Sequence, residues 1–247
     1  MYAESAPPDA LRRQVACVWT ARFGDDGEPH TDRIIPDGCI DIVWTGGRLT
    51  VAGPDTGWTP LAAEAGASFA GIRFRPGFAP AILGAPASAI VDARVDAAEL
   101  LGERAHRLVE RLVDARSPAG AVRELEMAIM AWRPAGPPSD RLIEGAVAAL
   151  RAAPATTPVA QLARELGTSE RQLNRRCVAA VGYGPKVLHR VLRLRRFLVL
   201  AAVPGVRGLA ALAAEVGYAD QAHLARDCLA LTGLSPARLR GRLITGG

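Results

Sequence analysis

The side chains whose types and spacing could do chemistry stand in two runs, fifty-one positions apart, near the end of the chain. The first holds Arg171, Asn174 and Arg175, whose i, i+3, i+4 spacing places them on one face of a helix. Arginine and asparagine can each form paired hydrogen bonds, which is how guanine and adenine edges are read in a major groove. The second run, poorer in long polar side chains, consists of Gln221, Ala222, Ala225 and Arg226.

Both runs belong to a segment that occurs twice between Val159 and Arg240. The residues that recur fifty or fifty-one positions later include Leu162, Ala163, Glu165, Gly167, Leu173, Arg175, Cys177, Gly182 and Pro185. The change of offset means that the second copy has one extra residue in its turn. Because a solenoid needs about three repeats to bury a continuous core, two copies indicate a pair of similar modules instead.

Each copy has the pattern of a helix, a tight turn and a second helix. Gly167 and Gly217 stand where the first helix should end, and Ser169 and Asp220 stand where the second should be capped. Leu173 and its equivalent face inward, which leaves the polar run on the outside. The expected units span residues 159–180 and 209–231.

A long basic helix is expected to join the units over residues 185–202. Pro185 is favourable in a first turn, and Pro204 and Gly205 should stop the helix. We assign the apolar side to Val187, Leu188, Val191, Leu192, Leu194, Leu198 and Val199, and the polar side to Lys186, Arg190, Arg193, Arg195 and Arg196. A rod of about 25 Å could hold two helices roughly one DNA turn apart, near 34 Å.

These features resemble the DNA-binding domain of the AraC/XylS family of transcriptional regulators, over about residues 141–242. The family carries base contacts at the positions of the two runs, so the resemblance agrees with the helical geometry. The alternative is that Arg175 and Arg226 are ordinary solvated charges. Cys177 and Cys228 depart from the family, because a large aromatic residue usually fills the recognition-helix core there.

Phosphate contacts are expected from basic side chains and from helix N-termini, which position a protein without reading sequence. The residues assigned to this role are Ser169, Lys186, Arg190, His223, Ser235 and Arg238. The charge distribution agrees with this assignment. Residues 1–138 hold 14 arginines and 18 acidic residues, whereas residues 139–247 hold 16 basic and 7 acidic residues. The surface that binds a polyanion should therefore be C-terminal.

The first third of the chain predicts short antiparallel strands separated by glycine and proline. Expected strands lie at residues 12–22, 39–44, 48–52 and 67–75, and Ile40, Ile42 and Trp44 should share one face. The fold class is therefore α+β, with a small antiparallel barrel or sandwich before an all-α domain. The motifs of this region also resemble an N-terminal domain of unknown function that is often fused to this DNA-binding module, and by analogy a reduced cupin-like effector domain.

A small-molecule effector would bind in this N-terminal domain, with Arg73, Arg75 and Trp44 as candidate contacts. Both arginines point off the apolar face of their strand, where they could bind an anion. The alternative for them is pairing with Asp37 or Asp41.

The segment after the strands predicts helices over residues 79–83, 97–115 and 119–132, followed by a linker at 133–138 and a helix at 140–152. We divide the chain into an effector-type domain (1–92), a helical linker or dimerisation segment (93–133) and the DNA-binding domain (139–245). In the family, helices at this place mediate dimerisation and relay the signal. The resemblance thus implies double-stranded DNA, a small-molecule effector, a second copy of the chain and RNA polymerase as partners.

Enzymatic chemistry finds little support in the sequence. There is no paired-carboxylate spacing, no Ser-His-Asp context and no phosphate-binding glycine loop before a helix. Cys39 could be a reactive thiol or methyl acceptor, and His30 or His106 could be a ligand, but each is better explained as a packed or surface residue. We therefore expect no catalytic residue, no metal and no cofactor.

Without a signal pattern or a long apolar run, we expect a cytoplasmic protein with no membrane segment. A ligand-binding or protein-interaction regulator that has lost DNA binding remains the alternative, and it would explain the alanines of the second run.

Overall fold

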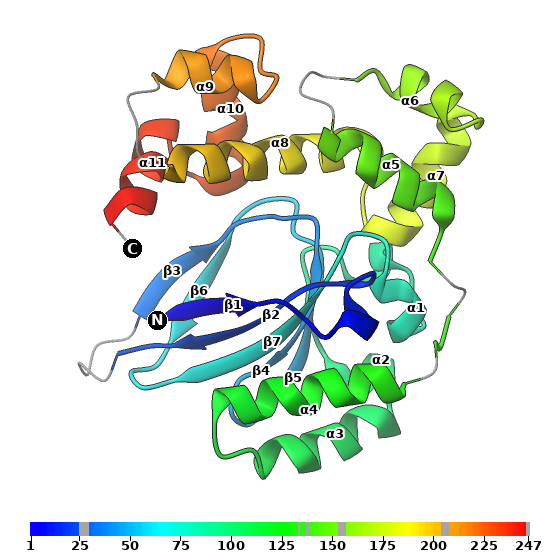
Figure 1. Cartoon of the computed structure of the whole chain (residues 1–247), viewed down its shortest axis with the longest axis vertical. Coiled ribbons are helices and arrows are strands. Elements are labelled where there is room, and N and C mark those ends of the chain that lie inside the picture. The colour runs from blue at the N-terminus through cyan, green and yellow to red at the C-terminus, as the bar shows by residue number, and fades with distance from the viewer. Residues whose placement is uncertain (25–29, 133, 137–138, 153–156, 204–207, 246–247) are drawn as a thin grey trace.

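The structure is a computed structural model that describes residues 1–24, 30–132, 134–136, 139–152, 157–203 and 208–245. Its first half is an antiparallel β structure with helices on one side (Figure 1). The strands are β1 (Tyr2–Ser5), β2 (Val15–Arg22), β3 (His30–Ile34), β4 (Ile40–Trp44), β5 (Leu49–Ala52), β6 (Thr59–Ala63), β7 (Ser68–Phe74) and β8 (Arg94–Asp96).

Six strands form one sheet in the order β1-β2-β7-β4-β5-β8, and β3 pairs with β6 in a separate two-stranded ladder. All of these pairings are antiparallel, as predicted. The outer strands β1 and β8 are not paired with each other in this order, so the sheet is not closed into a barrel. The α+β fold class predicted from the sequence is confirmed, with open sheets in place of a closed barrel.

Apolar and polar residues alternate along the strands, and the apolar ones form the main core of this half. Ile40, Ile42 and Trp44 point to one face, as predicted, and lie in the same buried cluster as Ile72 and Phe74. The helices α1 (Ala79–Leu83), α2 (Ala97–Leu101), α3 (Glu103–Val113) and α4 (Pro118–Ala131) add their apolar sides to this cluster. The helical segment assigned to dimerisation therefore shares a core with the sheet.

Several elements were not anticipated from the sequence. The strands β1, β3, β6 and β8 were not among those expected, and they have few fully buried residues, so their apolar alternation is weak. The single helix expected over residues 97–115 is interrupted at Gly102, whose φ of 54° ends α2 and starts α3. Of the expected linker, the structure describes residues 134–136, where the amides of Ala135 and Gly136 both donate to the carbonyl of Ala81. This stretch is therefore held against α1.

The second half is all-α. Its helices are α5 (Arg141–Ala152), α6 (Val159–Glu165), α7 (Glu170–Val181), α8 (Pro185–Ala202), α9 (Leu209–Glu215), α10 (Gln221–Thr232) and α11 (Pro236–Thr245). Figure 1 shows α8 as an unbroken rod with α6–α7 at one end and α9–α10 at the other. The predicted pair of helix-turn-helix units joined by one long helix is confirmed. The Pro204-Gly205 stop signal lies outside the described residues.

The apolar side of α8 holds the two units in one core. Leu188, Val191 and Leu194 are fully buried, as is Phe197, which the sequence analysis did not place. Two predicted orientations were wrong. Val199 was assigned to the apolar side but is 63% exposed, and Arg193 was assigned to the polar side but is only 6% exposed.

Candidate nucleic-acid interface

The second helices of the two units, α7 and α10, are built alike. Each has twelve residues and begins at a side-chain cap, where Ser169 accepts a hydrogen bond from the amide of Gln172 and Asp220 accepts one from the amide of His223. Each ends at a glycine in the left-handed conformation, Gly182 or Gly233. Because both ends are fixed in the same way, equivalent side chains of the two helices keep equivalent positions.

The turns that enter these helices are also equivalent. Gly167 and Gly217 have φ of 65° and 84°. The amide of Thr168 donates to the carbonyl of Ala163, and that of Tyr218 donates to the carbonyl of Ala213, each over 2.9 Å. The extra residue of the second turn, inferred from the repeat, therefore leaves the hydrogen bonding of the turn unchanged.

The residues assigned to base reading lie on the outer faces of these helices. In α7, Leu173 is fully buried whereas Arg171, Asn174 and Arg175 are exposed. In α10, the assigned residues are exposed or half-buried, namely Gln221, Ala222, Ala225 and Arg226. The geometry leaves both sets accessible to a ligand, and their role in base reading stays a prediction.

The residues assigned to phosphate contacts divide into two kinds. Lys186, Ser169, Ser235 and Arg238 are exposed. Arg190 and His223 are partly occupied within the protein, because Arg190 donates from Nε to Asp227 over 3.0 Å and the His223 ring lies edge-on to Tyr218 with centroids 5.0 Å apart.

A buried ion cluster at the junction of α8 and α10 was missed from the sequence. The Asp227 carboxylate, 6% exposed, pairs with Arg190 over 3.0 Å and with Arg193 over 3.1 Å. The Arg193 guanidinium also lies 4.5 Å from the ring centroid of Tyr218. Asp227 follows Arg226 directly, so a helical wheel that places Leu224 and Cys228 inside could also have placed it inside.

The equivalent position in the first unit carries the opposite charge. Arg176 in α7 donates from Nε to Asp140, the residue before α5, over 2.6 Å, in a pair that is 36% and 23% exposed at its two side chains. This pairing leaves the other two arginines of α7 accessible, since Arg171 and Arg175 remain exposed. Each unit is therefore joined to its neighbouring helix by an ion pair, which is partly exposed in the first unit and buried in the second.

The cysteines of the recognition helices are core residues. Cys177 and Cys228 are each 0% exposed, and burial raises the pKa of each thiol to about 12. Both thiols therefore pack as small apolar side chains, at positions where the family usually has a large aromatic residue.

The three candidate effector residues lie in different surroundings. Arg73 bonds to the carboxylates of Asp41 (3.1 Å) and Asp37 (3.2 Å), which is the pairing considered as the alternative, and also to Glu4 (3.1 Å), which was not anticipated. Burial raises the pKa of Asp41 to about 6, although Arg73 opposes the shift. Arg75 donates from Nε to the carbonyl of Arg12, and Trp44 is buried in the main core.

The N-terminal domain contacts the end of each recognition helix. At α7, a Cβ added to Gly182 would lie 2.6 Å from Pro54 and 2.9 Å from Val91. At α10, a Cβ added to Gly233 would lie 2.2 Å from Arg33 and 2.7 Å from Trp58. These two glycines are the equivalent residues of the repeat, so the N-terminal domain meets the same point of both units.

Within the part of the chain that the structure describes, no group of three or more His, Cys, Asp and Glu residues could hold a metal ion. None of the described helices combines the length and the apolar character needed to cross a bilayer.

Two family models match the chain. Residues 162–242 match a model described as a helix-turn-helix domain, and residues 3–96 match a domain of unknown function, DUF6597. A search of curated proteins found no match.

Solved structures resemble the chain in fold. One is wild-type ToxT from Vibrio cholerae strain SCE256, bound to an unsaturated fatty acid. The two proteins are 10% identical, and the match covers 95% of this chain and 97% of ToxT with a TM-score of 0.51. An apo variant of ToxT from the same strain is 10% identical, and the match covers 92% of this chain and 97% of that chain with a TM-score of 0.50. A transcriptional regulator from Chromobacterium violaceum with an AraC-type DNA-binding domain is 20% identical, over 43% of this chain and 96% of that chain, with a TM-score of 0.39.

Proposed function

We propose that this chain, whose C-terminal region is an AraC-type helix-turn-helix domain, is a sequence-specific DNA-binding regulator of transcription in the cytoplasm. The observation that carries the proposal is the pair of equivalent helices, α7 and α10, held at the two ends of the unbroken helix α8 with their outer side chains exposed. Such a pair can enter successive major grooves on one face of a duplex.

The charge of the exposed residues supports the same function. Lys186 and Arg238 follow the recognition helices in the chain, are exposed and form no ion pair among the described residues, so they are suited to phosphate oxygens. The capped N-termini at Ser169 and Asp220 direct main-chain amides outward, although the Asp220 carboxylate makes the second terminus less favourable for an anion.

Selection of bound fragments from a random DNA pool tests the proposal. We expect one enriched sequence with two conserved patches about one helical turn apart and a Kd that rises steeply with salt. Failure to enrich any sequence, together with affinity that does not depend on salt, would favour the alternative of a regulator that has lost DNA binding.

We further propose that an effector acts through the contacts between the domains. Arg33 and Trp58 touch the end of α10, and Pro54 and Val91 touch the end of α7, so a change in the N-terminal domain reaches both recognition helices directly. A small shift at these contacts would alter the relative placement of the helices. ToxT, which shares the fold at low identity, has been observed with a bound fatty acid, and this supports a small molecule as the kind of effector.

The effector proposal is tested by measuring DNA affinity with and without fractions of cell metabolites. An active fraction should shift the Kd of the natural protein, typically by about 5- to 150-fold for allosteric coupling. The Trp58→Ala variant should still bind DNA but respond less, because its contact with the end of α10 is smaller. An equal response in both proteins would argue against this route.

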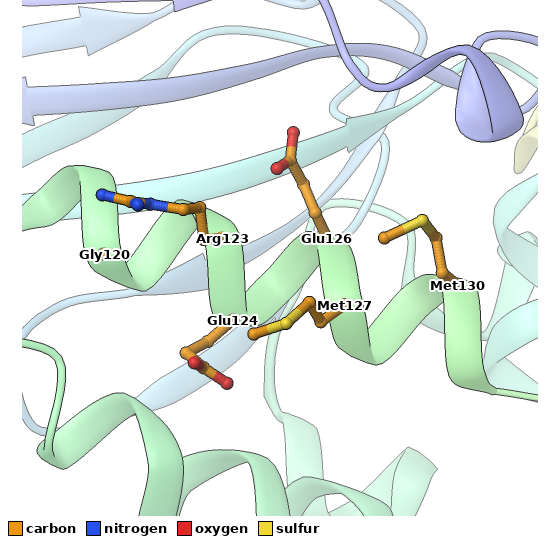
Figure 2. Close-up of a pocket in the computed structure, with 6 residues that line it drawn as sticks. All are labelled: Gly120, Arg123, Glu124, Glu126, Met127 and Met130. Carbon is orange, nitrogen blue, oxygen red and sulfur yellow. The ribbon is translucent and has the colours of Figure 1, made fainter.

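A homodimer formed through α4 is the third part of the proposal. Met127 and Met130 are each 48% exposed and lie on the outer side of α4, beside Arg123 and Glu126 (Figure 2). In an antiparallel pairing of two copies, the methionines would meet and each Arg123 could face a Glu126. Sedimentation should give a dimer that dissociates in the Met127→Glu variant, while the exposed substitution Arg107→Glu on α3 serves as a control. A natural protein that stays monomeric at micromolar concentration would contradict it.

A further inference from the structure

The outer face of α10 differs in chemistry from that of α7, although the two helices correspond residue for residue. Arg171 corresponds to Ala222, and Asn174 corresponds to Ala225. Leu229 lies two turns after Ala222 on the same face and is 62% exposed. At Ala222 and Ala225, α10 therefore presents methyl groups where α7 presents hydrogen-bond donors and acceptors, whereas Leu229 corresponds to another apolar residue, Val178.

The contacts within the chain do not explain an exposed leucine at this place. The N-terminal domain reaches α10 at its last turn, where Arg33 bonds to the carbonyl of Thr232 and Gly57 lies near the carbonyl of Ala230. Leu229 keeps most of its surface open in this arrangement. A single exposed leucine is ordinary on a protein surface, so the indication comes from its combination with Ala222 and Ala225, which extend the apolar surface along the outer face of the same helix.

The charges around this face favour a nucleic acid as that ligand. The carboxylate of Asp227 is buried and paired with Arg190 and Arg193, so it presents little negative charge to the outside. Arg226 is exposed on α10 and Arg238 is exposed on α11, and they outnumber the exposed carboxylate of Asp220 at the start of α10. A cationic surface with an apolar stripe is complementary to a major groove, in which the 5-methyl group of thymine is the apolar feature.

We propose that α10 reads thymine through contacts of Ala222, Ala225 and Leu229 with its 5-methyl group, while α7 reads its half of the site by hydrogen bonds. This inference rests on the proposed function, because it requires α10 to enter a major groove. It divides one operator into two halves that are recognised by different chemistry. Arg226 supplies the second half with a guanine contact beside the thymines.

Replacing thymine by deoxyuridine, which lacks the 5-methyl group, tests this division in the full-length protein. The selected site is made with uracil in one half at a time, and the half contacted by α10 is identified by its loss of footprint in the Arg226→Ala variant. Affinity should fall about fourfold for each buried methyl group lost from that half. Uracil in the α7 half should leave the Kd unchanged.

Two variants sharpen the test. The Leu229→Ala protein should lose less affinity on uracil substitution than the natural protein does. The double variant Ala222→Arg with Ala225→Asn gives α10 the residues of α7, and it should select a second half that resembles the first and tolerates uracil. Because these positions are exposed or half-buried, the variants should fold, which a thermal melt checks.

The outcomes separate the two proposals. Specific binding with no uracil penalty in the α10 half would overturn the thymine inference and leave the DNA-binding function standing. The absence of specific binding to any sequence would overturn both. A penalty confined to the α10 half, and reduced in Leu229→Ala, supports the inference.

Discussion

The guanidinium of Arg33 in β3 donates from Nη1 to the main-chain carbonyl of Thr232, 2.9 Å away, in the last turn of α10. It also lies over the indole of Trp58, 4.1 Å from the ring centroid. Carbonyls in a last helical turn lack partners within the helix and carry the negative end of its dipole. The N-terminal domain therefore supplies a cationic cap to the second recognition helix.

Removal of this cap should loosen the end of α10. In the Arg33→Ala variant, amide hydrogen exchange of Gly233 and Leu234 should become faster, because one charge-assisted hydrogen bond worth about 1–2 kcal/mol is lost. The Arg33→Lys variant keeps the charge and should recover part of the protection. Unchanged exchange in Arg33→Ala would mean that the contact does not stabilise the helix end.

Loss of Arg175 should change which bases are preferred. We expect Arg175→Ala to cost about 1–3 kcal/mol of binding free energy and to relax selection at one position of the α7 half. Lys186→Ala is the matched control, since a phosphate contact should weaken all sequences alike and reduce the salt slope by about one. If Arg175→Ala kept the natural base preference, α7 would not be the helix that reads this position.

The buried ion pairs of Asp227 and the partly exposed pair of Asp140 should differ in their contribution to stability. Asp227→Ala leaves two guanidinium groups without their carboxylate, one of them buried, and should lower the free energy of unfolding by about 3–5 kcal/mol. Asp140→Ala breaks the equivalent pair, which is more exposed to solvent, and should cost about 0–1 kcal/mol, apart from any loss of capping at α5. Urea denaturation measures both, and equal losses would contradict this assignment of burial.

Acid should destabilise the C-terminal domain through His189. Burial, and after it the charge of Arg193, lower the pKa of His189 below its ordinary value, and the side chain is 5% exposed. The unfolded chain takes up a proton near its ordinary pKa, about 6.5, whereas the folded chain does so only at lower pH. The contribution is thus complete above pH about 6.5 and is lost as the pH falls below it. The melting temperature of the His189→Met variant should depend less on pH over this range than that of the natural protein. An identical pH dependence in the two proteins would contradict the role of His189.

The thiols of Cys177 and Cys228 should not react in the folded protein. Their pKa values of about 12 leave almost no thiolate at pH 8, and neither side chain is exposed. Labelling with a thiol reagent followed by peptide mapping should find both residues unmodified until denaturant is added. Rapid labelling of either in the native protein would contradict their burial in the core.

The sequence predicted the C-terminal domain well because its signals are local. Caps at Ser169 and Asp220, and glycines after each helix, act within a few residues and are repeated, so one copy supports the reading of the other. The position of Asp227 could not be predicted with equal ease. Its burial depends on partners in α8, thirty-odd positions away, and an aspartate beside an exposed arginine looks solvated in the sequence alone.

The N-terminal domain was less predictable because its pairing is between distant segments. The edge strand β1 pairs with β2 from Tyr2 with Ala21 to Ser5 with Val18, although all four of its residues are exposed and give no apolar alternation. The bond from Arg33 to Thr232 joins residues 199 positions apart. Neither could be inferred from local pattern, whereas the alternating Ile40, Ile42 and Trp44 could.

Gly182 and Gly233 each serve two purposes, since they allow a left-handed turn and leave room for the other domain. Any side chain at either residue would both strain its own backbone and wedge the halves of the molecule apart. A genetic screen for mutants that no longer respond to the effector should therefore yield substitutions at these two glycines. Neither glycine is among the residues assigned to base contacts, so such mutants would separate the response to the signal from DNA recognition.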